Sequence, residues 1–307
     1  LAVDTNSINF FSLPNNITFL ASSFAGGASG YPVCFDNFKI DEKKKIIDRN
    51  NRALFARNNK LINTTNPKFY MPYAGFFEEK ATRDKTIHEI NEKMSIEKYE
   101  NFFEKKKNEI LNVNKFQKYT FLGEELTKKE KINKKFNDFE IDNYLENQKR
   151  FYNKLSNNDI IDYFKNCKFN SKLKLFINLT NDDFSNTYNS FIVNFSKRKT
   201  NIEFLKQSAY EFFNKEKEKK ITSNLIYASI RLEAFVNVIK NYLPWEDMLI
   251  GFQLRIQRFP DVYNSDFWYH FSNIYVKSSR KSSLSQCNFC EIILQKFDTT
   301  YIRDTKI

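Results

Sequence analysis

Phe24-Ala25-Gly26-Gly27-Ala28-Ser29-Gly30-Tyr31-Pro32 holds three of the six glycines in a chain of 307 residues. Directly before it, the apolar, partly β-branched run Ile17–Ala21 is typical of a buried strand. The sequence therefore predicts a glycine loop at the carboxyl end of a strand. Glycines there allow positive φ and close approach of the backbone to a ligand, and successive N–H groups can bind an anion. A sharp surface turn is the alternative explanation.

Residues 1–80 are expected to fold as strand, strand, glycine loop, helix and strand. The helix is expected near Asp41–Ile62, with Asp41 as its N-cap and with Ile47 and Leu61 on its buried face. Phe69-Tyr70-Met71 is expected to form a short strand, because two prolines flank it.

Beyond residue 80 the pattern changes twice. Residues 81–165 are charged, with aromatic and aliphatic side chains at helical spacing, so we expect a helical connection there. In residues 166–275 the apolar side chains first alternate, as Leu173, Leu175, Ile177 and Leu179 do, which predicts a half-buried strand. Further strands are expected at 191–195, 225–230 and 252–257, and further helices from residues 235, 244 and 260. This order predicts an α+β domain at 166–275, followed by a tail at 276–307.

Composition limits the classes of function. The formal charge of +12 suggests an anionic ligand, but the basic residues are spread over the chain rather than gathered on one element, which argues against nucleic-acid binding. The scattered cysteines and the lack of a secretory or membrane-spanning segment favour the cytoplasm. The chain begins at Leu1 rather than at a methionine, so a truncated or processed chain is expected.

Two distant parts of the chain resemble one family. The first part is Phe24–Gly30 with Pro67, Tyr70, Pro72, Ala74-Gly75 and Glu79. The second part is Val238–Asn241, Trp245–Asp247, Ile250–Gln253, Arg255, Arg258, Pro260-Asp261, Tyr263, Phe267-Trp268 and His270-Phe271. In this order they resemble the C-terminal portion of the CMP-N-acetylneuraminate hydroxylase family, and collinear matches at two ends are more specific than a short motif.

The resemblance implies an α/β plus α+β fold. Residues 1–80 would be the closing half of a metallo-β-lactamase-type αββα fold, and residues 166–275 would be a sterol-carrier-protein-like domain. The family hydroxylates the N-acetyl methyl group of a sialic acid nucleotide sugar with O₂ and electrons from a donor such as cytochrome b5. The implied partners are therefore CMP-sialic acid or a related nucleotide sugar and this electron donor.

A Rieske [2Fe–2S] cluster is implied in the upstream part of an intact protein rather than in this chain. The cluster needs a Cys-x-His and a Cys-x-x-His pair, whereas the only histidines here are His88 and His270, and neither has a cysteine near it in sequence. The His-rich run of a metallo-β-lactamase metal site is also absent. Cys287-Asn288-Phe289-Cys290 is a pair without a second pair, so two ordinary thiols are the simpler interpretation.

The candidate site residues follow from the loop and the resemblance. Substrate binding is expected from Gly26, Gly27, Ser29, Gly30 and Arg255, the last because a guanidinium fork suits phosphate and carboxylate groups.

A metal role is expected for Asp4, at the end of a strand, with an alternative role as a turn cap. The sequence thus favours the non-Rieske portion of a hydroxylase-like oxygenase. Two alternatives stay open, a metallo-β-lactamase-fold hydrolase with its metal ligands upstream and a non-catalytic nucleotide-sugar binding or assembly module.

Overall fold

The chain forms two compact units, and each is described by itself. The first unit comprises residues 1–147 and 250–256, and the second comprises residues 148–249 and 257–307. Together they hold mixed α/β structure, as the sequence predicts, while the metallo-β-lactamase-type and sterol-carrier-protein-type assignments and the domain limits stay predictions. The computed structural model describes residues 8–24, 30–74, 79–103, 108–112, 117–131, 140–196, 199–219 and 224–273.

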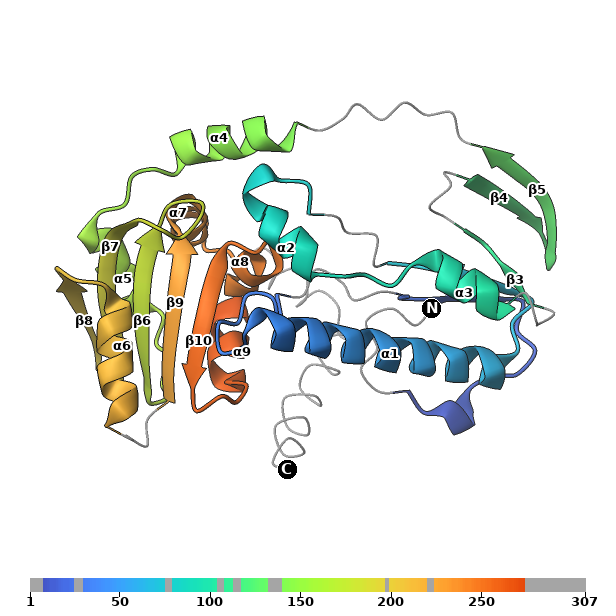
Figure 1. The fold of residues 1–307 in the computed structure, drawn as a ribbon, viewed down its shortest axis with the longest axis horizontal. Coiled ribbons are helices and arrows are strands. Elements are labelled where there is room, and N and C mark those ends of the chain that lie inside the picture. The colour runs from blue at the N-terminus through green and yellow to red at the C-terminus, as the bar shows by residue number, and fades with distance from the viewer. Residues whose placement is uncertain are drawn as a thin grey trace, which may run out of the picture. The chain divides into compact units, whose positions relative to one another are not determined.

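The first unit is built on a parallel sheet in the order β1-β2-β3. The long helix α1 connects β1 to β2 and packs on the sheet through Leu61 and Ile62 (Figure 1). The described elements of the first unit are η1 (Phe10–Ser12), β1 (Phe19–Ser22), α1 (Ile40–Thr65), β2 (Phe69–Pro72), η2 (Thr82–Asp84), α2 (Lys85–Ile90), α3 (Ile96–Phe103), β3 (Glu109–Ile110), β4 (Gln117–Leu122), β5 (Glu125–Lys131) and the start of α4 (Ile141–Phe151).

The two ends of α1 lie at Lys39 and Asn66. The backbone N–H of Lys39, at the N-cap position, donates to Glu42 Oε2 at 2.7 Å, and this bond satisfies one of the free N–H groups that a helix start leaves. The expectation that Asp41 is the N-cap is therefore wrong. Asp41 instead lies in the first turn, where its negative charge interacts favourably with the positive end of the helix dipole. Asn66 ends the helix in a left-handed conformation with φ 40°.

The expectation of a purely helical segment at 81–165 is also wrong. It contains β3, which pairs in parallel with β2, and the antiparallel hairpin of β4 and β5. The hairpin turns at Gly123, whose φ of +58° is one that side-chain-bearing residues rarely adopt. Phe121 packs edge-on against Phe69 with ring centroids 5.1 Å apart, so aromatic packing on the parallel sheet overrides the charged composition of the hairpin.

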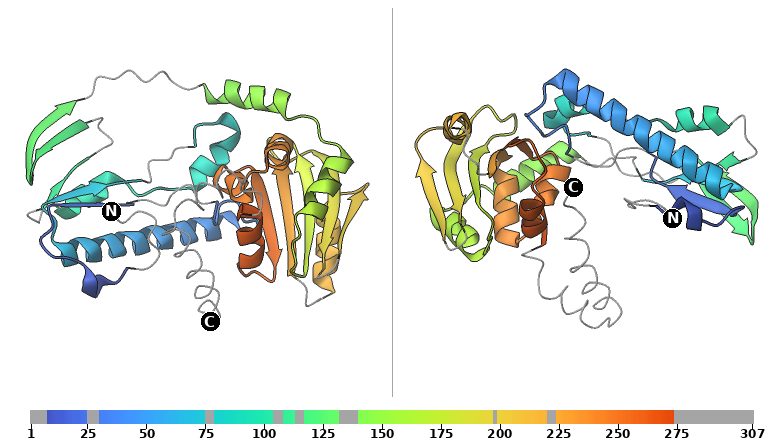
Figure 2. Two further views of the ribbon diagram at one scale, coloured as in Figure 1. Left: turned by 180° about the vertical axis from the view of Figure 1, so that it is seen from behind. Right: turned by 90° about the horizontal axis from the view of Figure 1, so that it is seen from below.

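The second unit is built on a five-stranded mixed sheet in the order β10-β9-β6-β7-β8. β6 pairs in parallel with β9 and antiparallel with β7, and β7 pairs antiparallel with β8. α6 lies in front of the sheet in Figure 1, and α5 lies in front of it in the view from behind (Figure 2). The elements are α5 (Asn157–Asn166), β6 (Leu173–Thr180), β7 (Thr187–Phe195), β8 (Thr200–Leu205), α6 (Ala209–Glu218), β9 (Asn224–Arg231), α7 (Leu232–Asn241), α8 (Trp245–Ile250), β10 (Leu254–Phe259), which starts within the residues of the first unit, and α9 (Ser265–Asn273).

The strand predicted at Leu173 is confirmed, but it is not half-buried. Phe176 packs with Phe213 of α6 on one face of the sheet, and the other face is covered by aromatic side chains such as Phe164 of α5. β6 is therefore buried on both faces, and Asn178 is buried because Ser190, Ser208 and Tyr227 hydrogen-bond to it.

Candidate functional site

The strand ends of the first unit define where a ligand can bind. α1 has 26 residues and β1 has four, so the helix is about three times as long as the strand. Asn58, about two thirds of the way along α1, contacts Ser22, the last residue of β1. The first two thirds of α1 therefore extend past the carboxyl ends of the parallel strands, which is the side where open α/β sheets bind their ligands.

A buried network of polar side chains lies at this strand end. Ser22 Oγ donates to Asn58 Oδ1 at 3.2 Å, and Tyr70 OH is 3.0 Å from Ser22 Oγ. Asn58 Nδ2 donates to Tyr99 OH at 3.0 Å. Burial raises the pKa of Tyr99 to about 12 and raises the pKa of Tyr70 further, so both phenols stay neutral at physiological pH.

This network fixes the chain at the point where it leaves β1. Asn58 Nδ2 also donates to the carbonyl of Ser23 at 2.7 Å, and Tyr99 OH donates to the carbonyl of Phe24 at 3.1 Å. Two elements, α1 and α3, thus hold Ser23 and Phe24, the two residues that follow β1. The loop residues Gly26, Gly27 and Ser29 lie outside the described residues, as do Asp4, Cys287 and Cys290.

The chain after the loop is held from α1 and from β10. The carbonyl of Gly30 accepts a hydrogen bond from Cys34 N at 2.7 Å. Lys43, which is 6% exposed, donates from Nζ to the carbonyl of Val33 at 2.8 Å and to Asp36 Oδ1 at 3.1 Å.

Arg255 reaches the same turn. Its Nη1 lies 3.1 Å from the carbonyl of Leu254 and 3.9 Å from Cys34 Sγ, in a part of β10 that belongs to the first unit. The structure therefore brings Gly30 and Arg255 together around Cys34. Their part in substrate binding stays a prediction.

Sequence reasoning missed Asn58 and Lys43. Both lie on the apolar face of α1, since Asn58 is four residues after Leu54 and Lys43 is four residues before Ile47. A polar residue inside an apolar stripe is a signal that a sequence reader can find, although its partners come from other elements.

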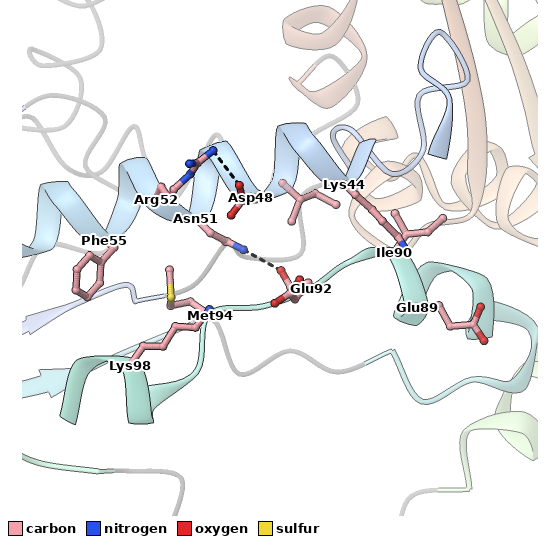
Figure 3. A pocket seen from close by; sticks show the side chains of 11 residues that line it. Lys44, Asp48, Asn51, Arg52, Phe55, Glu89, Ile90, Glu92, Met94 and Lys98 are labelled. Carbon is pink, nitrogen blue, oxygen red and sulfur yellow. Dashed lines mark hydrogen bonds and ion pairs between the residues drawn. The ribbon is translucent and has the colours of Figure 1, made fainter. Parts of the chain in front are cut away.

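A cavity of about 360 Å³ lies beside α1, along its part that extends past the strands. Ile47, Ile90 and Met94 give it an apolar floor, and charged side chains of both signs surround it (Figure 3). Arg52 is paired with Asp48 at 2.9 Å, so the basic groups left on the rim are Lys44 and Lys98.

The second unit has a cavity of about 570 Å³ at the carboxyl ends of β6 and β9. Its lining includes Asp182, Asp183 and Glu233 but one lysine, Lys149, which is paired with Asp182. This acidic lining disfavours an anionic ligand, so the strand ends of the first unit are the better candidate site for one.

The described residues do not fit a Rieske cluster, which needs two cysteines and two histidines. Among them, Cys34 belongs to the first unit and Cys167 to the second, and no group of three His, Cys, Asp or Glu side chains is placed to hold a metal ion. Cys167 is buried, and burial raises the pKa of its thiol to about 11. No helix in the described ranges combines the length and the apolar character that a membrane crossing requires.

Comparison with known proteins agrees with the resemblance found in the sequence. The chain is 29% identical over 287 residues to the cytidine monophosphate-N-acetylneuraminic acid hydroxylase of Macaca mulatta, covering 88% of this chain and 46% of that protein. It is 31% identical over 295 residues to the hydroxylase of Xenopus laevis, with 88% and 46% covered, and 29% identical to the human protein named as inactive, with 88% and 54% covered. No protein-family model and no solved structure matches the chain.

The chain spans about half the length of these curated relatives. Over 88% of its own length, it is homologous to the cytidine monophosphate-N-acetylneuraminic acid hydroxylases.

Proposed function

We propose that this chain is the non-Rieske portion of a CMP-N-acetylneuraminate hydroxylase-like oxygenase and that its first unit binds the sialic acid nucleotide sugar. The observation that carries the proposal is the buried Ser22, Asn58, Tyr70 and Tyr99 network, which fixes the exit of β1 at the carboxyl ends of parallel strands. Homology to hydroxylases named for this nucleotide sugar supplies the substrate class.

In this proposal the chain binds and orients the substrate. Electrons would pass from a donor such as cytochrome b5 to a [2Fe–2S] cluster held outside the residues described here. The reaction would insert one oxygen of O₂ into a C–H bond of the N-acetyl methyl group, and the other oxygen would leave as water after uptake of two electrons and two protons.

Isothermal titration calorimetry tests the binding step. We expect saturable binding of one CMP-N-acetylneuraminic acid per chain and much weaker binding of UDP-N-acetylglucosamine, which has a different base and no sugar carboxylate. Equal binding of both compounds, or no binding of either, would contradict the proposal.

The loop can be tested with the same measurement. Gly27→Val adds a branched side chain where the sequence predicts positive φ and close approach to an anion, so we expect at least a tenfold loss of affinity, with a smaller effect on thermal stability. Unchanged affinity in a folded variant would show that the loop is only a turn.

A further inference from the structure

Arg57 of α1 carries a guanidinium whose Nε and Nη2 atoms are buried and have no hydrogen-bond partner among the described residues. The other basic groups of α1 that are described above differ, because Lys43 bonds to Val33 and Asp36, and Arg52 is paired with Asp48. Leaving a buried cationic donor without an acceptor is costly, so such groups are usually paired with an anion.

The two atoms without partners form one edge of the guanidinium. Nε–H and the nearer N–H of Nη2 point in the same direction, and this side-on fork matches the two oxygens of a carboxylate or phosphate. The edge is therefore arranged for bidentate binding of an oxyanion, which a lysine ammonium cannot reproduce.

The place of Arg57 on α1 points to the strand ends. Arg57 directly precedes Asn58, which contacts Ser22 and Ser23 at the end of β1. Side chains of a helix lean toward its N-terminus, and the N-terminal part of α1 extends past the carboxyl ends of the strands. Arg57 is therefore level with the strand ends along α1, and the general tilt of helix side chains along the axis is toward the side where a ligand of the parallel sheet binds.

We propose that the Nε and Nη2 edge of Arg57 binds the phosphate or the carboxylate of the nucleotide sugar. This inference rests on the proposed function, since it assigns a residue to the same site. The net charge of +12 favours an anion, and Asp48, which lies nearer the N-terminus of the same helix, is already engaged by Arg52.

Binding assays with parts of the substrate test the inference on the full 307-residue chain. Arg57→Gln should weaken CMP-N-acetylneuraminic acid about 10- to 100-fold, and Arg57→Lys should restore only part of the loss, because the charge remains but the fork is gone. Arg49→Gln, a change of the same type at an exposed position of the same helix, is the matched control and should change affinity less than about twofold. CMP supplies the phosphate alone and N-acetylneuraminic acid the carboxylate alone, so the compound whose affinity falls identifies the group bound.

The melting temperature without ligand shows whether Arg57 is paired with a carboxylate of the chain itself. If the fork is unpaired in the free chain, Arg57→Gln should leave the ligand-free melting temperature unchanged or raise it. A fall larger than that of Arg49→Gln would mean that a carboxylate of the chain itself is the partner, and it would overturn the inference. Wild-type affinity of Arg57→Gln for CMP-N-acetylneuraminic acid would overturn it as well.

Failure of the proposed function is distinguishable from failure of this inference. If the wild-type chain binds no nucleotide sugar, inorganic phosphate serves as the probe in the thermal-shift assay. If phosphate stabilises the wild type but not Arg57→Gln, the oxyanion site is upheld and only the proposed substrate is wrong. No stabilisation of the wild type would overturn the inference.

Discussion

Asn58 shows how one polar side chain can organise the site. It is 1% exposed, and its amide contacts Ser22, Ser23 and Tyr99, which come from two different elements and the chain segment that follows β1. A buried polar network of this kind is stable only while each member keeps its partners.

Asn58→Leu should therefore lower the free energy of unfolding by about 3 kcal/mol, because it leaves buried donors and acceptors without partners. Asn63→Leu on the same helix is the control, since the Asn63 side chain is exposed, and it should change the free energy by less than about 0.5 kcal/mol. Denaturant titration measures both values. Equal effects of the two substitutions would show that the network does not stabilise the fold.

Tyr99 gives the site a dependence on alkaline pH. Burial raises its pKa from 10.0 to about 12, so between these values the folded state keeps a proton that the unfolded state has lost. Stability from this group is complete below about pH 10 and falls as pH rises toward about 12.

Unfolding free energies measured from about pH 9 to about pH 11 should fall more steeply in the wild type than in Tyr99→Phe, which cannot ionise there. Tyr269→Phe, which changes an exposed tyrosine, should follow the wild type. Parallel curves for the wild type and Tyr99→Phe would contradict the burial of a neutral phenol.

The strand of the candidate site was predictable from the sequence, whereas its buried polar network was not. The apolar run before Gly26 predicts a strand, which β1 confirms, and the ligand-binding role of the loop that follows stays a prediction. The partners of Asn58 were not predictable, because Ser22 and Tyr99 are separated from it by 36 and 41 residues and meet it only in the fold.

Among the elements, the segment between α2 and α3 is bonded to one buried carboxylate. Glu79 accepts from Asn91 Nδ2 at 2.7 Å, and Lys93 Nζ lies 3.1 Å from each of its oxygens. Burial raises the pKa of Glu79, but the hydrogen bonds from Asn91 and Lys93 outweigh burial and hold the pKa below its usual range.

A depressed carboxyl pKa stabilises the folded state above the unfolded pKa and loses this effect as pH falls through the folded value. Glu79→Gln should thus lower the unfolding free energy by about 2 kcal/mol at neutral pH, and the difference from the wild type should shrink below about pH 4. Glu89→Gln, an exposed change on α2, is the control. A difference that does not change with pH would exclude the ionised pair.

Strands with apolar runs were predicted from the sequence, whereas elements with many polar residues were missed. Strands at 173, 191 and 225 are confirmed because their apolar runs match β6, β7 and β9. β8 and α6 were missed although Ile202 and Phe204 alternate with polar residues and Ser208 caps α6 through Tyr210 N. The hairpin of β4 and β5 was missed because its lysines and glutamates mask an alternation that only packing of Phe121 reveals.

For the whole molecule, the sequence predicted the α/β class and the order of most elements after residue 173, but not the assignment of residues to units. Residues 250–256 return to the first unit, where Ile256 N donates to the carbonyl of Cys34 at 2.8 Å. No local pattern records such a contact between positions more than two hundred residues apart.

We propose that the first unit holds the nucleotide-sugar site at its strand ends. Hydrogen–deuterium exchange of the full chain with and without CMP-N-acetylneuraminic acid tests it most directly. We expect the nucleotide sugar to slow exchange in residues 19–38 and 54–62. Slowed exchange confined to residues 180–190 and 231–233, around the acidic cavity of the second unit, would contradict it.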